Sequence, residues 1–298
     1  MKKKYINLVN KSKWLRSEIF EMVVKVNQGH IASSLSQAEI LISLYYSGIL
    51  NIKKKNPKYK NRDRVIVSKG HSAMGAYPIF ADLGYINKNE LSKYGTPSGK
   101  LRIYGDKSIP GIETTSGSLA QAPGIATGFA YCSKLDKQNF YTYVILSDGE
   151  HYEGQLWETA MFAAHYKLDN LVFIVDRNKQ IILGKNEKLL KLEPLRKKWE
   201  SFGWNVFDIN GHKYSELVPV LKKTRKLKNG KPSLIIANTI KGKGISYMED
   251  VTRWHNTMPN DKQIQIARKD LLKNCIHEEK LFRFQKIFKV SIYEGCCD

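Results

Sequence analysis

The sequence has no long apolar run. No stretch approaches the ~18 consecutive apolar residues that a membrane-spanning helix needs. The start, Met1–Tyr5, leads into polar sequence and not into the apolar core of a secretory signal. Both a membrane protein and a secreted protein are therefore disfavoured. We expect a cytoplasmic protein with no membrane partner.

Cysteine is scarce, and long linkers and repeats are missing. No two of the four cysteines have the CxxC spacing typical of a zinc or redox site. They are Cys132, Cys275, Cys296 and Cys297. We expect all four to be reduced thiols. No low-complexity linker or internal repeat divides the 298 residues, which are enough to bury the core of one large α/β domain.

Acidic residues are few compared with basic ones. Lys and Arg number 49 against 28 Asp and Glu, which gives a net charge of +21. Such a charge is typical of proteins that bind nucleic acid or anionic membranes. Here the lysines form short scattered groups, such as Lys53–Lys55 and Lys222–Lys223, without a recognition motif. We expect no nucleic-acid partner; a solvated face, or attraction of phosphorylated substrates or of an acidic partner chain, is compatible with the same charge.

Short apolar runs rich in β-branched residues alternate with segments of helical spacing. Five runs are typical of buried parallel strands: Arg64–Ser68, Tyr141–Ser147, Leu171–Asp176, Trp204–Ile209 and Ser233–Asn238. Helical spacing of apolar residues marks Ser36–Tyr46, Gln155–Tyr166 and Ser215–Leu227. This alternation predicts an α/β fold with a doubly wound, mostly parallel sheet flanked by helices. We assign residues 1–260 to this domain and residues 261–298 to a C-terminal arm.

Polar residues stand directly after two of the predicted strands. Asp148 and Gly149 follow one strand, and Asn178 follows the next. Ligands of doubly wound sheets bind at the carboxyl ends of the strands, and Mg²⁺ typically takes one or two protein oxygens together with phosphate and water. The pair therefore predicts a metal-diphosphate site, where Gly149 would let the backbone approach the phosphate. Taken singly, Asp148 or Asn178 is explained equally well as a turn or a helix cap.

The same segment resembles the thiamine-diphosphate motif, which usually begins Gly-Asp-Gly and ends in paired asparagines. Asp148-Gly149 is followed, after 28 residues, by Asn178, while Ser147 and Arg177 replace the first glycine and the first asparagine. The surrounding residues resemble the transketolase family in particular. They are Glu153–Glu158 and Ala163–Leu171, with the further blocks Gly29–His30, Leu35–Glu39, Ser68–Ser72, Pro110–Leu119, Lys241–Gly244 and Trp254–His255. The resemblance spans about residues 10–260.

The resemblance implies roles for the matching residues. It implies that Asp148, Asn178 and the backbone carbonyl of Gln180 bind a divalent metal, Mg²⁺ or Ca²⁺. The residues implied to contact or support thiamine diphosphate are Gly149, His71 and His255 at the diphosphate, Gly117 and Leu119 beside the rings, and Asn178 and Glu153 around the metal. His30, His71 and His255 are implied to be catalytic and to line the substrate channel, a task that suits imidazole near neutral pH. Any one of these histidines could also be an ordinary core or surface residue.

The activity implied by the resemblance needs more than this chain. A transketolase moves a two-carbon ketol unit from a ketose, often a phosphate ester, to an aldose, and the cofactor supplies the carbanion. In the family, the glutamate that activates the aminopyrimidine lies in a second domain. About 40 residues follow Trp254–His255, too few for another α/β domain. We therefore expect a separate subunit with the pyrimidine-binding domain and the activating glutamate, in a heterotetramer of two copies of each chain.

Three departures from the family pattern leave alternatives open. Tyr104 stands where the family usually has a further channel histidine, so a donor to sugar hydroxyls is lost, which is compatible with a deoxy or otherwise modified sugar. Ala120 and Ala122 replace glycines, and Ser147 adds a side chain beside the metal. A related thiamine-diphosphate enzyme of specialised sugar biosynthesis is one alternative. A non-catalytic interaction subunit with the same fold is the other.

Overall fold

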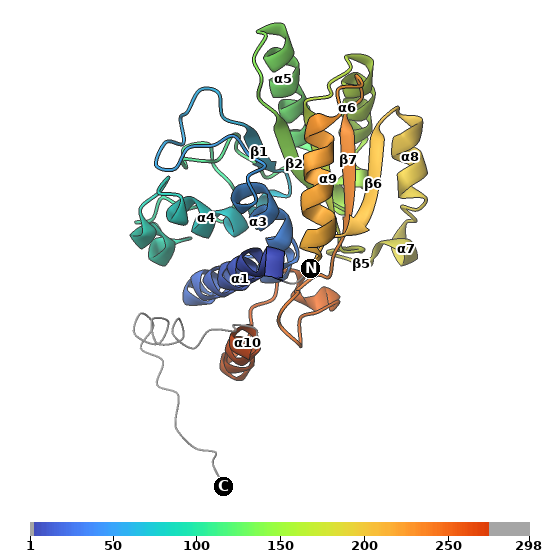
Figure 1. The fold of residues 1–298 in the computed structure, drawn as a ribbon. Coiled ribbons are helices and arrows are strands. Elements are labelled where there is room, and N and C mark those ends of the chain that lie inside the picture. Colours follow the sequence, from blue (N-terminus) through green and yellow to red (C-terminus); the bar gives the residue numbers. More distant parts are fainter. Residues whose placement is uncertain (1–2, 274–298) are drawn as a thin grey trace.

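The computed structural model describes residues 3–273, and a five-stranded parallel sheet lies at its centre (Figure 1). The strand order is β1-β2-β3-β7-β6. The strands are β1 (Arg64–Val67), β2 (Thr142–Ser147), β3 (Leu171–Arg177), β6 (Asn205–Asn210) and β7 (Ser233–Asn238). These are the five predicted strands, and the parallel α/β fold is confirmed.

Helices connect the strands and cover both faces of the sheet. The α-helices are α1 (Ile6–Val26), α2 (Ile31–Ser36), α3 (Ala38–Tyr46), α4 (Tyr77–Asp82), α5 (Gln121–Leu135), α6 (Gly154–His165), α7 (Asn186–Leu189), α8 (Leu195–Ser201), α9 (Tyr214–Lys226) and α10 (Asp261–Lys273). The 3-10 helices are η1 (Lys3–Tyr5), η2 (Gly70–Ala76), η3 (Lys88–Lys93), η4 (Gly149–Tyr152) and η5 (Thr252–His255). A hairpin of β4 (Gln180–Ile181) and β5 (Gly184–Lys185) follows β3. Helices α3, α6 and α9 confirm the three predicted ones, and the long helices α1 and α5 are additional.

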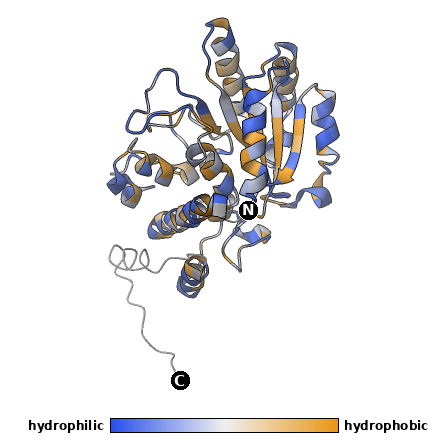
Figure 2. Ribbon diagram, in the orientation of Figure 1, coloured by the Kyte–Doolittle hydropathy of each residue, from blue (hydrophilic) through white to orange (hydrophobic). Residues whose placement is uncertain are grey.

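Successive residues of each strand face two separate cores. On β3, Val172 and Ile174 lie in a core shared with α1, α3 and α9, whereas Phe173 and Val175 lie in a core shared with α5, α6 and α8. Side chains of a strand alternate between the two faces of a sheet, so a strand buried on both faces is apolar throughout. Figure 2 shows this as apolar colour along the strands.

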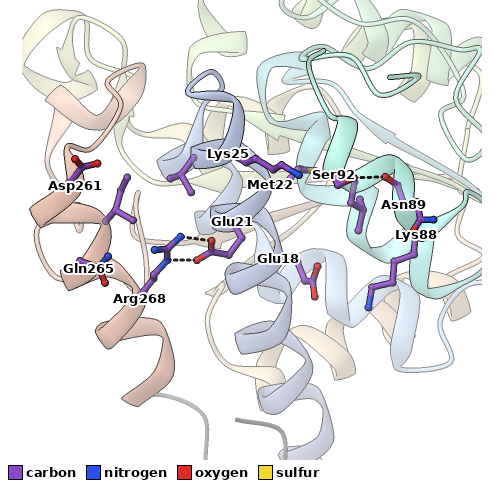
Figure 3. A pocket seen from close by; sticks show the side chains of 13 residues that line it. Glu18, Glu21, Met22, Lys25, Lys88, Asn89, Ser92, Asp261, Gln265 and Arg268 are labelled. Atoms are coloured by element: carbon purple, nitrogen blue, oxygen red, sulfur yellow. Dashed lines mark hydrogen bonds and ion pairs between the residues drawn. The ribbon is translucent and has the colours of Figure 1, made fainter. Parts of the chain in front are cut away.

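Helix α10 packs against α1. Its residues Ala267 and Leu271 lie in the same core as α1, and Arg268 donates to the Glu21 carboxylate at 2.7 and 2.8 Å. A groove of about 800 Å³ lies between α1, η3 and α10 beside this ion pair (Figure 3). The domain boundary at residue 260 stays a prediction, and residues 274–298 of the predicted arm lie outside the described residues.

The state of the cysteines and the lack of a membrane-spanning helix, both expected from the sequence, can be compared with residues 3–273. Cys132 is an exposed free thiol, whereas the other three cysteines fall outside residues 3–273. None of the helices within that range is both long and apolar enough to cross a membrane.

Candidate active site

Asp148 and Asn178 lie at the carboxyl ends of the neighbouring strands β2 and β3. Asp148 is fully buried, and its Oδ1 accepts a hydrogen bond from Arg177 Nη1 at 3.0 Å. Its Oδ2 accepts one from the backbone N–H of Lys179 at 2.5 Å. Because Lys179 follows Asn178 directly, the carboxylate reaches the peptide next to the predicted amide ligand. The sheet therefore brings the two predicted residues to the same edge.

The turn after β3 is tied to the loop that carries η5. Asn178 Oδ1 accepts from the Gln180 backbone N–H at 3.1 Å. The buried Gln180 side chain donates through Nε2 to Asp250 Oδ1 at 2.6 Å and accepts from Thr252 Oγ1 at 3.1 Å. These bonds fix the predicted metal ligands relative to His255, the last residue of η5.

The three predicted histidines come together from distant parts of the chain. The ring centroids of His30 and His71 are 5.0 Å apart, those of His71 and His255 are 5.3 Å apart, and those of His30 and His255 are 5.6 Å apart. His30 precedes α2, His71 lies in η2, and His255 lies in η5. His30 Nδ1 is buried and has no hydrogen-bond partner among the described residues. The cluster therefore keeps unused capacity to bind a ligand.

Two buried lysines accompany the histidines, and sequence reasoning assigned neither a role. Lys241 Nζ donates to His255 Nδ1 at 2.7 Å. Lys69 Nζ donates to the Ser33 carbonyl at 2.8 Å and forms an ion pair with Asp176, which is also buried. Both lysines stand in blocks that resemble the family. That position was the available signal, but burial of a lysine cannot be read from sequence.

Burial and the lysines keep the histidines uncharged. Burial, followed by the charge of Lys241, lowers the pKa of His255 to about 3. The pKa of His71 is well below its usual value because of burial and Lys69, and burial and Lys241 lower the pKa of His30. Burial and then Lys69 lower the pKa of Lys241 to about 8. At neutral pH the histidines are therefore neutral, Lys241 is mostly protonated, and the cluster favours an anion.

The oxygens near Asp148 are of the type that a hard divalent cation prefers. Burial raises the pKa of Asp148 to about 6, although Arg177 acts in the opposite direction. A carboxylate offers about four lone-pair positions, and two of them are used here. Within residues 3–273, no three His, Cys, Asp or Glu side chains converge in a way that could hold a metal. A metal at this edge would therefore rest on one carboxylate with the Asn178 amide and the Gln180 carbonyl, an oxygen set that fits Mg²⁺.

The residues predicted beside the cofactor differ in their surroundings. A Cβ on Gly149 would lie 3.4 Å from Ile181 Cγ2 and 3.9 Å from Leu119 Cδ1, so Gly149 and Leu119 are neighbours. Gly117 is exposed, with open space where a side chain would project. Glu153 is exposed at the N-cap of α6. The cofactor contacts assigned to Gly117, Leu119, Gly149 and Glu153 stay predictions.

Glu150 is the buried carboxylate behind this edge, and sequence reasoning passed over it. It accepts hydrogen bonds from Ser147 N at 2.7 Å, Ser147 Oγ at 2.9 Å and Ala120 N at 3.2 Å, and another from Ser68 Oγ. Ala120 has a left-handed backbone with φ of 60°, which glycine would adopt more easily. Ser147 and Ala120, two of the departures from the family pattern, therefore share one hydrogen-bond acceptor.

The domain family described as transketolase, thiamine diphosphate binding domain, matches residues 7–285. The chain belongs to this family. An apulose-4-phosphate transketolase subunit of Phocaeicola vulgatus is 36% identical over 265 residues, which cover 89% of this chain and 94% of the relative. The 6-deoxy-6-sulfo-D-fructose transketolase subunit SqwG of Clostridium sp. is 36% identical over 274 residues, which cover 92% and 99%.

A solved structure agrees with this assignment. Transketolase from Campylobacter jejuni matches with a TM-score of 0.83 and 31% identity over 89% of this transketolase-family chain. The match covers 42% of the C. jejuni chain. The present chain therefore spans less than half the length of that enzyme.

Proposed function

We propose that this chain is the diphosphate-binding subunit of a transketolase that uses thiamine diphosphate and Mg²⁺ or Ca²⁺. It transfers a two-carbon ketol unit from a ketose or ketose phosphate to an aldose or aldose phosphate. The observation that carries this proposal is the convergence of three neutral histidines and two buried lysines at the sheet edge that holds Asp148 and Asn178. Membership of the family supports the choice of cofactor.

The residues at this edge of the sheet have different proposed tasks, which follow from their chemistry. Asp148, Asn178 and the Gln180 carbonyl would hold the metal, and the positive charge of Lys241 beside His255 would face the diphosphate. When bound, thiamine diphosphate supplies the carbanion chemistry that breaks and forms carbon–carbon bonds. The neutral imidazoles can donate hydrogen bonds to sugar hydroxyls and exchange protons with them. A buried, positively charged site of this kind argues against a non-catalytic interaction subunit.

The proposal includes a separate partner subunit with the pyrimidine-binding domain and the activating glutamate, in a heterotetramer of two copies of each chain. Two relatives that match over nearly their whole length are named as subunits, which supports a split enzyme. We also propose that the enzyme works in the cytoplasm, without nucleic acid or membrane partners.

Reconstitution tests this function. The chain would be mixed with a separately produced pyrimidine-domain subunit, thiamine diphosphate and Mg²⁺, and two-carbon transfer between sugars would be followed by product analysis. We expect transfer by the mixture and none by either protein on its own. Transfer at the full rate by this chain without its partner would contradict the split, and a mixture that binds the cofactor without any transfer would contradict the activity.

A modified sugar is a second candidate substrate, favoured by Tyr104. Its ring centroid lies 6.3 Å from that of His30, and the residue is 45% exposed, so a bulky aromatic ring borders the histidine cluster. The relatives named above act, by their names, on apulose 4-phosphate and on 6-deoxy-6-sulfo-D-fructose. In the reconstituted enzyme, we expect Tyr104→His to raise kcat/KM for unmodified ketose phosphates about 10-fold relative to Tyr104→Phe, a gain of ~1.4 kcal/mol in transition-state binding. Equal kcat/KM values of the two variants for unmodified ketose phosphates would show that residue 104 does not determine the choice of substrate.

A further inference from the structure

Arg177 is a buried cation at the end of β3, directly before Asn178. Its side chain is 1% exposed, and it stands where the family usually has an uncharged asparagine. Its Nη1 donates to Asp148 Oδ1 at 3.0 Å. A guanidinium therefore lies against the carboxylate to which the proposed function assigns a divalent metal, and like charges repel. The proposed function does not explain a positive charge in this place.

Two glutamates bind the other side of the same guanidinium. Arg177 Nη2 donates to Glu193 Oε1 at 2.9 Å and to Glu187 Oε1 at 3.2 Å. Together with Asp148, the guanidinium has three carboxylate partners, although one is enough to neutralise it. When all four groups are ionised, three negative charges and one positive charge leave a net charge of −2. This net charge matches a divalent cation, whereas Asp148 and Arg177 without the glutamates would cancel each other.

The backbone connects the same segment to the other oxygen of Asp148. Asp148 Oδ2 accepts from the Lys179 N–H at 2.5 Å, and the Lys179 carbonyl accepts from the Asn186 N–H at 3.1 Å. Asn186 is the first residue of α7 and directly precedes Glu187. Both oxygens of Asp148 are thus connected to the start of α7, one through Arg177 and the other through the backbone of Lys179. Bonds of this kind fix the orientation of a carboxylate that binds a metal.

The two glutamates are held by backbone donors of their own. Glu193 Oε2 accepts from the Leu195 N–H at 2.8 Å, and Glu187 Oε1 accepts from the Leu192 N–H at 3.3 Å. The glutamate side chains are 54% and 38% exposed, so their charges cost less to desolvate than fully buried ones. The guanidinium of Arg177 therefore takes its additional counter-charge from the surface.

We propose that Arg177 is a positioning residue, which holds the Asp148 carboxylate for a divalent metal. Glu187 and Glu193 offset its charge, so that the site still attracts a cation. This role of Arg177 rests on the proposed function, since it takes Asp148 to be a ligand of Mg²⁺. It adds to the metal site three residues that bind no metal themselves, two of them from the segment that follows the β4–β5 hairpin.

A double-mutant cycle that measures Mg²⁺ affinity tests this role. The complex of this chain with the pyrimidine-domain subunit would be titrated with Mg²⁺ in a calorimeter at a fixed excess of thiamine diphosphate, with the cofactor alone as the blank. We expect Arg177→Met to weaken Mg²⁺ binding about 10-fold, as do changes of other residues that support metal ligands. Glu193→Gln should weaken it about 5-fold when Arg177 is present and leave it unchanged in the Arg177→Met background, because coupled residues do not act additively.

Glu200→Gln is the matched control. Glu200 lies on α8 and is paired with Arg196 at 2.8 Å, so we expect this variant to bind Mg²⁺ like the wild type. Arg177→Lys should restore part of the affinity, because an ammonium keeps the charge but lacks the rigid fork of the guanidinium. Thermal unfolding would verify that each variant folds. If Arg177→Met does not fold, the combined Glu187→Gln and Glu193→Gln variant, changed only at partly exposed side chains, should still bind Mg²⁺ about 10-fold more weakly.

The outcomes distinguish this role from the proposed function. The role of Arg177 would be overturned by wild-type affinity in Arg177→Met or in the combined glutamate variant, by an additive cycle, or by a loss in Glu200→Gln as large as that in Glu193→Gln. Each of these results would leave the proposed function standing. A wild-type complex that binds no Mg²⁺ in the presence of the cofactor would instead contradict the proposed function, and the role of Arg177 with it.

Discussion

Two buried clusters of charged and histidine side chains differ in how completely the chain pairs them. In the first, Arg16 donates to both oxygens of Glu39 at 2.7 and 2.6 Å, and His212 Nδ1 bonds the same carboxylate at 2.8 Å. His212 Nε2 accepts from the Ile240 backbone N–H at 2.9 Å, so Nδ1 carries the proton. Each charge of this cluster has its partner within the chain.

The second cluster, at the sheet edge, is left open. Lys69 is paired with Asp176, whereas Lys241 has only the neutral His255 as a hydrogen-bond partner among the described residues. His30 Nδ1, in the same part of the structure, has none. The closed cluster connects α1, α3 and the segment before α9, while the open cluster has a lysine without a carboxylate partner among the described residues. The closed cluster is therefore expected to stabilise the fold, and the open cluster to take part in the proposed function.

The largest expected effect is on stability, in the closed cluster. Glu39→Gln leaves the Arg16 guanidinium buried without a counter-charge, and removal of one partner of a buried ion pair costs about 3–5 kcal/mol. Glu21→Gln is the matched control, because the pair with Arg268 is less buried, with side chains 29% and 12% exposed against 7% and 9% for Arg16 and Glu39, so we expect a smaller loss. The free energy of unfolding in urea measures both losses. Equal losses would contradict the distinction between the two pairs.

The closed cluster should also make stability depend on pH. Arg16 and His212 hold the pKa of Glu39 at about 2 despite its burial, below the ordinary value of 4.5. Its contribution is therefore fully present above pH 4.5 and is lost as the pH falls from there towards 2. Urea unfolding at a series of acidic pH values should show a shallower dependence in Glu39→Gln than in the wild type. The same dependence of the free energy of unfolding on pH in both proteins would show that Glu39 does not cause it.

The smallest of these effects concerns the open cluster. Lys241→Met removes a buried charge that has no carboxylate partner, so we expect thiamine diphosphate to bind about 10-fold more weakly, a loss of ~1.4 kcal/mol. Stability should be unchanged or slightly higher, because methionine needs no counter-charge in the interior. Lys243→Met is the control from the same loop, since Lys243 is paired with Glu249. Calorimetric titration and thermal unfolding of both variants would show whether affinity and stability separate in this way.

The sheet could be predicted from the sequence because buried strands need apolar residues on both faces. Strands β1, β2, β3 and β7 have such a run, so the pattern marks them, whereas β6 lies at the edge of the sheet, is partly exposed, and is marked only by Val206, Phe207 and Ile209. Helix α5 could not be predicted in this way. Its first residues lie at Ala120–Pro123, where the family has a glycine-rich turn, so the sequence suggests a turn there and not a helix. Pro123 in fact lies in the first turn of α5, where a missing N–H leaves no hydrogen bond unmade. The short hairpin β4–β5 has no apolar run by which it could be recognised.

The site could be predicted only as far as the resemblance reached. It named His30, His71 and His255, which come together, and Asp148 and Asn178, which share an edge. It could not tell which carboxylate of the Asp148–Glu153 segment is buried behind that edge, and Glu150 takes that place. The roles of the buried lysines and of Arg177 depend on burial and on partners distant in sequence. Such contacts are set by the tertiary structure and not by local pattern.

Calorimetric titration of thiamine diphosphate in the presence of Mg²⁺, on the pyrimidine-domain subunit reconstituted with the wild-type chain or with Asp148→Ala, tests the central claim most directly. We expect the affinity of the variant to fall at least about 100-fold, since even residues that only support metal ligands cost 10–100-fold when changed. The variant should stay folded, because Arg177 keeps its bonds to Glu187 and Glu193. Equal affinity of the two proteins for thiamine diphosphate would show that Asp148 does not hold a metal for the diphosphate.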